Sequence, residues 1–182
     1  MTPKEIADKF EQRIHDDLVG YLQSSDLADK HLPECIDVED CWPVIIRDYL
    51  PDGAREFQKY PMVSLGWMML IGMAMAQYWD EDWTTYAAEQ HIYHLLRDLR
   101  GYDKMDDAIL EDVLHFEGES VAKASAIVQD CASRVYSALN REQVEPGTEA
   151  ALGCYLAALH QLYLSGMWMQ LRTLGYRMTK IS

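Results

Sequence analysis

The residues best suited to chemistry lie together in one short stretch, between positions 89 and 98. Two histidines three positions apart, His91 and His94, are followed by Asp98. Imidazole nitrogens and carboxylate oxygens are ligands that zinc, iron and related divalent transition metals accept. His115 could add a fourth ligand from another segment of the chain. One interpretation is therefore a metal site formed by His91, His94, Asp98 and His115.

The helix predicted over residues 83–100 weakens this metal interpretation. At 100° per residue, His91 lies about 80°, Asp98 about 100° and His94 about 140° from the centre of the apolar face. The cluster should therefore face the rim and the solvent, with His94 and Asp98 as an i,i+4 pair. The sequence also lacks any Glu-x-x-His, which di-metal helical bundles use to direct ligands inward. A solvated face without a cofactor is thus the simpler interpretation, and a divalent transition metal is the alternative.

His160 is a second candidate because it lies in a segment, residues 150–171, that carries no formal charge. In such an apolar helix the imidazole should be desolvated and bonded to a carbonyl, a tyrosine or water. The alternative is a small-ligand pocket in which His160 is the polar anchor. The other candidate residues for that pocket are two glutamines and two tryptophans, Gln77, Gln161, Trp67 and Trp168.

Other sequence signals of chemistry are weak. No nucleophile elbow, P-loop or dinucleotide-binding fingerprint occurs. His31, Cys35 and Cys41 could supply zinc ligands, but their spacing matches no strong pattern. The four cysteines include no CxxC pair, and the N-terminus lacks the basic-then-apolar layout of a signal peptide. We therefore expect a cytoplasmic protein with reduced cysteines.

Two apolar segments, residues 61–79 and 150–171, should form the centre of the fold. Neither contains a charged side chain, and a helix that is apolar on every side is either surrounded by protein or spans a membrane. Ser64, Gln77 and the many small residues in the first segment favour a core helix, and a membrane hairpin is the less favoured alternative. Gly66 and Gly72 should let neighbouring helices approach closely.

Amphipathic segments should surround this centre. Thr2 begins a capping box, and the apolar residues that follow at every fourth position predict a helix of about 22 residues. Further helices are expected over residues 41–50, 54–59, 83–100, 104–116 and 119–141, with a break at Pro51. We therefore expect a single all-α domain over residues 1–182, a bundle of about six or seven helices.

The charge balance narrows the range of partners. The chain has 16 basic and 30 acidic side chains and a formal net charge of −14, which disfavours contact with a nucleic-acid backbone. Because the core is complete and no catalytic set stands out, the leading hypothesis is a non-catalytic protein-interaction or regulatory module with an acidic surface, which could also form a homo-oligomer. A metal-dependent helical enzyme and a small-molecule binder are the alternatives.

Overall fold

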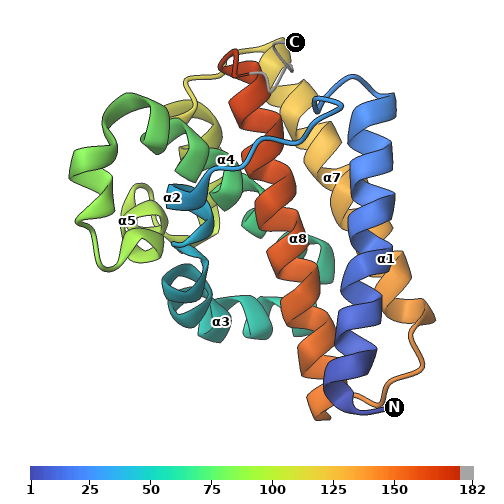
Figure 1. The fold of residues 1–182 in the computed structure, drawn as a ribbon. Coiled ribbons are helices and arrows are strands. Elements are labelled where there is room, and N and C mark those ends of the chain that lie inside the picture. The colour runs from blue at the N-terminus through green and yellow to red at the C-terminus, as the bar shows by residue number, and fades with distance from the viewer. Residues whose placement is uncertain (177–182) are drawn as a thin grey trace.

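The computed structural model describes residues 1–176, and this part of the chain contains helices and loops but no strand. The prediction of an all-α helical bundle is confirmed. The long helices are α1 (Pro3–Ser24), α3 (Trp42–Lys59), α4 (Pro61–Ala87), α7 (Glu119–Arg141) and α8 (Glu149–Thr173), and the short ones are α2 (Ile36–Glu39), α5 (Ile92–Asp98) and α6 (Met105–Asp107) (Figure 1).

The two apolar helices, α4 and α8, pack against each other at the centre, as predicted. Every side chain of α4 from Ser64 to Tyr78 is buried. Gly72 lies against the backbone carbonyl of Tyr163, and Gly166 lies against that of Met69. A Cβ atom at either glycine would collide with the opposite backbone. The absence of two side chains therefore sets the distance between the two central helices.

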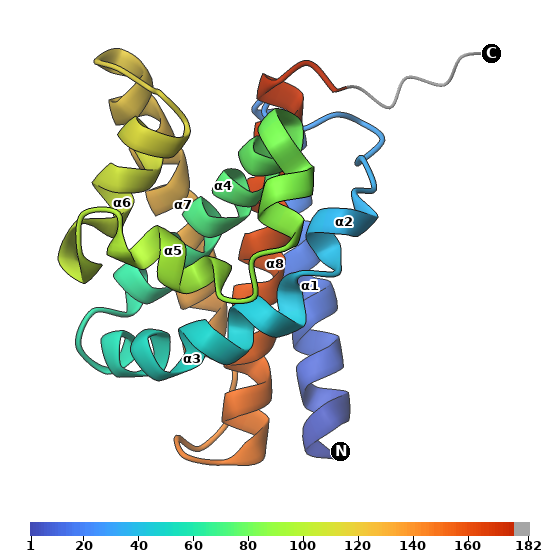
Figure 2. The same cartoon turned by 90° about the vertical axis from the view of Figure 1, so that its left-hand side faces the viewer.

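Two amphipathic helices cover this pair. In Figures 1 and 2, α1 lies along α8, while α7 packs on α4. The buried residues of α1 follow every fourth position, and the Thr2 hydroxyl accepts a hydrogen bond from the Glu5 backbone N–H at 3.1 Å. At the other end of the molecule, Arg172 of α8 forms an ion pair with Asp26 at 2.6 Å. The periodicity and cap predicted for the first helix are both present.

The predicted break at Pro51 is wrong, because α3 continues through the proline to Lys59. The Tyr49 ring packs so closely on Gly53 that a Cβ there would overlap it. The Tyr49 hydroxyl donates a hydrogen bond of 2.6 Å to the Ser64 carbonyl in α4. The contact between Tyr49 and Gly53 within α3 and the hydrogen bond to α4 hold the helix together where proline removes a backbone donor.

The predicted helix over residues 83–100 is divided in the structure. Residues up to Ala87 belong to α4, which kinks at Asp82 (φ −162°, ψ 73°), and α5 begins only at Ile92. The Asp82 carboxylate accepts a hydrogen bond of 3.4 Å from the Thr85 backbone N–H and so caps the segment after the kink. As a result, His91 occupies the residue before α5, where its φ is −132° and its ψ is 53°.

The segment predicted as one helix over 104–116 combines a short 3₁₀ turn (Tyr102–Lys104), α6 and a π-helical turn (Ala108–Val113). His115 follows with φ at +58°.

All four cysteines are free. Among residues 1–176, no helix is both long enough and apolar enough to cross a bilayer.

Candidate metal centre

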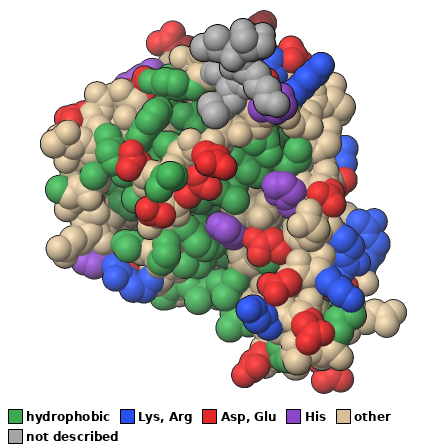
Figure 3. Space-filling view, viewed as in Figure 1, with side chains coloured by type: hydrophobic (Ala, Val, Ile, Leu, Met, Phe, Trp, Pro, Cys, Tyr) green, Lys and Arg blue, Asp and Glu red, His purple; other side chains and the backbone are tan. Residues whose placement is uncertain are grey.

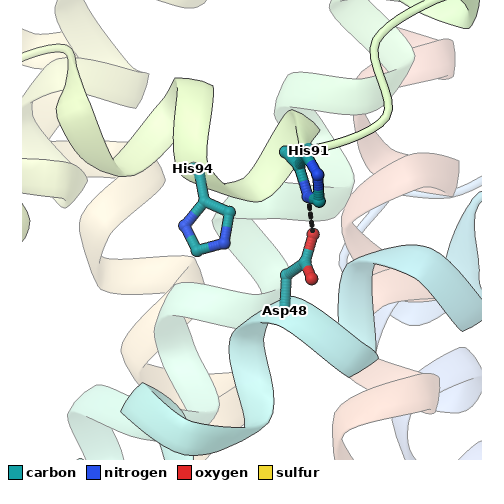
Figure 4. A group of neighbouring side chains, drawn as sticks. All are labelled: Asp48, His91 and His94. Carbon is teal, nitrogen blue, oxygen red and sulfur yellow. Dashed lines mark hydrogen bonds and ion pairs between the residues drawn. The ribbon is translucent and has the colours of Figure 1, made fainter.

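Asp48, His91 and His94 converge between α3 and α5 (Figure 4). Each residue offers one ligand atom, a carboxylate oxygen or a ring nitrogen, and these atoms all lie within 4.8 Å of one another. Asp48 comes from the first half of α3, His91 immediately precedes α5, and His94 lies in the first turn of α5. The contact between α3 and α5 therefore brings two imidazoles and one carboxylate together.

The carboxylate of Asp48 is held from two sides. Arg47 donates from Nε to Oδ1 at 3.0 Å and from Nη2 to Oδ2 at 3.2 Å, and His91 Nδ1 lies 3.1 Å from Oδ2. The Asp48 side chain is only 9% exposed. The hydrogen bond from Arg47, with a smaller contribution from His91, holds the pKa of Asp48 below its usual range. The carboxylate is therefore kept in the ionised form that binds metals.

The His94 ring has one nitrogen on the side of Asp48 and the other, Nδ1, on the opposite side (Figure 4). Its Nδ1 is buried and has no hydrogen-bond partner among residues 1–176. The centroid of the ring lies 5.6 Å from that of His91. A buried ring nitrogen without a partner is costly, and coordination of the ring to a metal would fix its orientation and tautomer.

The three residues fit a mononuclear metal site. Ligand atoms about 2.0–2.1 Å from one zinc ion stand roughly 3.3 Å apart in a tetrahedron. Since the three atoms already lie within 4.8 Å of one another, each pair has to close by at most about 1.5 Å, which side-chain rotation can supply. Three protein ligands leave a coordination position open. A pocket of about 340 Å³ also reaches His91 and is lined in part by Cys41, Arg47 and Tyr86.

The remaining residues of the metal set predicted from the sequence lie elsewhere. Asp98 accepts a hydrogen bond from Arg97 Nε at 3.1 Å, and its side chain is 66% exposed. Within the described residues, no hydrogen bond joins it to His94. His115 Nε2 lies 3.7 Å from Glu81 Oε1, beside the kink in α4. The structure thus brings His91 and His94 together and replaces Asp98 and His115 with Asp48.

Sequence reasoning missed Asp48 because it lies 43 positions before His91 on a different helix. Its neighbours Arg47 and Tyr49 give it no distinguishing motif. Asp48 lies within the helix predicted over residues 41–50, so the missing information was the packing of α5 against that helix.

The residues proposed for a small-ligand pocket occupy three separate places. His160 and Gln161 both bond to Glu11 of α1, at 2.9 and 2.8 Å, and Trp168 lies nearby, edge-on to His15 at 5.6 Å. Gln77 accepts a hydrogen bond from Gln170 at 2.9 Å and donates one to Glu81 at 2.7 Å. Trp67 lines a different groove, beside α7.

The expectation that His160 is desolvated is wrong. Its side chain is 33% exposed, and its ring packs on Trp42 with the centroids 4.9 Å apart. This side of α8 meets a polar position of α1, because Glu11 lies between the buried residues of that helix. The hydrogen bond from His160 is the largest influence on Glu11 and lowers the pKa of that carboxyl.

Comparisons with known proteins gave no match, so the functional argument depends on the side-chain geometry. No protein-family model matches the chain. No match was found among curated proteins or among solved structures.

Proposed function

We propose that the protein binds one divalent transition metal ion through Asp48, His91 and His94. The observation that carries this proposal is the convergence of two imidazoles and a carboxylate held in its ionised form, within 4.8 Å of one another. Two histidines and one carboxylate hold zinc in several hydrolases and Fe(II) in non-haem oxygenases.

The ligand count favours a metal-dependent enzyme over a structural metal site. Structural zinc is usually enclosed by four protein ligands, whereas catalytic zinc keeps a position for water or substrate. The bound ion would supply Lewis acidity next to the pocket that reaches His91. Arg47 would act as a positioning residue, because it holds both oxygens of Asp48.

Isothermal titration calorimetry of chelator-treated protein with Zn²⁺ tests the proposal. The wild-type protein should bind about one ion per chain, and His91→Ala/His94→Ala should lose that binding. A matched control is His31→Ala/His115→Ala, which removes two exposed histidines outside the site. Zinc binding that survives in the first variant, or is lost in the control, would contradict the proposal.

A second candidate function is protein–protein interaction through the acidic surface of a cytoplasmic protein. It is favoured by Ile36, which is 66% exposed and is followed by Asp37, Glu39 and Asp40. Hydrophobic side chains also gather over the left half of the face shown in Figure 3, with acidic ones among them. If this surface mediates homo-oligomer formation, sedimentation velocity should detect self-association that Ile36→Asp weakens. A monomer at all concentrations would remove the homo-oligomer from this candidate function.

A further inference from the structure

A groove of about 470 Å³ lies between α4, α7 and the segment that contains α6. Its apolar lining includes Val63, Trp67 and Leu70 from α4, together with Leu110 and Val128. Gly66 also lines it, and a Cβ there would lie 3.2 Å from Val128 Cγ1. The volume falls within the range of small-molecule sites, about 300–1,000 Å³, which are mostly apolar with a few polar groups.

The charges of this groove all have the same sign. Glu56, Asp103 and Asp106 contribute to its lining, and no basic residue does. Asp103 is exposed, while Glu56 and Asp106 are half-buried, so these groups are more accessible than the apolar floor. An anionic ligand would be repelled here, whereas a cation would find partners.

An aromatic wall adjoins one of these carboxylates. The Tyr102 ring packs edge-on against Trp67, with the centroids 5.0 Å apart. The Tyr102 hydroxyl also donates a hydrogen bond to Glu56 Oε2 at 3.2 Å. Tyr102 thus contacts both Trp67 and the Glu56 carboxylate. Aromatic faces combined with carboxylates recognise ammonium groups, through cation–π attraction and charge pairing.

We infer that this groove binds a small organic amine. The apolar body of the amine lies on Trp67 and Leu70. The ammonium group of the amine faces the three carboxylates of Glu56, Asp103 and Asp106. The acidic side chains at the groove and its apolar floor select this ligand class. The inference does not depend on the metal site, because none of the three proposed metal ligands lines the groove.

Three probes with the same apolar body test the inference: phenylbutylamine, phenylbutanol and phenylbutanoate. In isothermal titration calorimetry of the full chain, the amine should bind at least about tenfold more tightly than the carboxylate, with the alcohol between them. Equal affinity for all three probes would show an unselective apolar groove and would overturn the inference. Preference for the carboxylate would overturn it as well.

Variants locate the binding. Asp103→Asn/Asp106→Asn should weaken binding of the amine about three- to tenfold and leave the alcohol unchanged. Glu5→Gln/Glu145→Gln makes the same change in net charge at two exposed sites outside the groove and should leave the amine affinity unchanged. Amine selectivity that is equal in both double variants would contradict the inference.

Filling the groove gives an independent test. Ser125 and Gln129 lie on its α7 side, and neither is fully buried. Ser125→Phe and Gln129→Trp should each reduce binding of the amine and the alcohol while the circular dichroism spectrum stays helical. Undiminished binding in a folded variant of either kind would place the amine elsewhere and refute the inference.

Discussion

Asp48 and Asp98 are the two carboxylates that could act with His91 and His94. The structure favours Asp48, because its ligand atom lies within 4.8 Å of those of both histidines, whereas the Asp98 side chain is 66% exposed and lies outside this group. Asp48→Asn should therefore weaken zinc binding by at least about tenfold, since an amide oxygen is a poorer and uncharged ligand. Asp98→Asn serves as the matched control and should leave the affinity unchanged. The opposite pattern in a competitive chelator titration would assign the carboxylate to Asp98.

A separate prediction concerns how the contribution of Glu11 to the free energy of unfolding depends on pH. Its pKa is lowered in the folded protein, chiefly by the hydrogen bond from His160. A carboxyl with a lowered folded-state pKa contributes stability above its unfolded value, about 4.3, and that stability is lost as the pH falls through the folded-state pKa. Glu11→Gln should therefore be less stable than the wild type at neutral pH, and the difference should shrink below about pH 4.3.

Urea denaturation over a series of pH values measures this difference. Glu145→Gln is a suitable control, because the Glu145 side chain is exposed and makes no hydrogen bond or ion pair within residues 1–176. It should show no comparable change with pH. If the loss in free energy of unfolding caused by Glu11→Gln is as large at the lowest pH where the protein still folds as at neutral pH, the Glu11–His160 contact does not stabilise the fold.

At the scale of elements, the contact between α4 and α8 depends on two glycines. Gly72→Ala or Gly166→Ala would force a Cβ into the backbone of the opposite helix, and overpacking of this kind costs about 1–3 kcal/mol. Gly20→Ala in α1 is the control, because no atom lies within 4 Å of the added Cβ. It should raise the free energy of unfolding by about 0.5–1 kcal/mol. If all three substitutions were stabilising, the predicted close approach of α4 and α8 would be wrong.

The sequence predicted elements well where a single local signal was decisive. The four-residue spacing in α1 and the uncharged runs of α4 and α8 correctly identified the helices and their burial. Boundaries failed where tertiary contacts overrode local signals. The Tyr49 hydroxyl and the Gly53 carbonyl, on either side of Pro51, both form hydrogen bonds with Ser64 of α4 where α3 continues. Contacts of this kind between two helices leave no periodic trace in the sequence.

At the scale of the whole molecule, the candidate site could be predicted only in part. His91 and His94 were found because they are close in the sequence. Asp48 could not be, because its approach depends on how α3 packs against α5. The same limit explains His160, whose environment is set by Glu11 on another helix. Helical periodicity identifies the polar face of a helix, but it does not identify which side chain of another helix contacts that face.

The most direct test of the metal proposal is anomalous X-ray diffraction at the zinc absorption edge, from crystals grown with Zn²⁺. The account predicts one strong peak between α3 and α5, about 2.0–2.2 Å from the Asp48 carboxylate and from a ring nitrogen of each of His91 and His94. The absence of a peak between these side chains, or a peak only at His115 and Glu81, would contradict it.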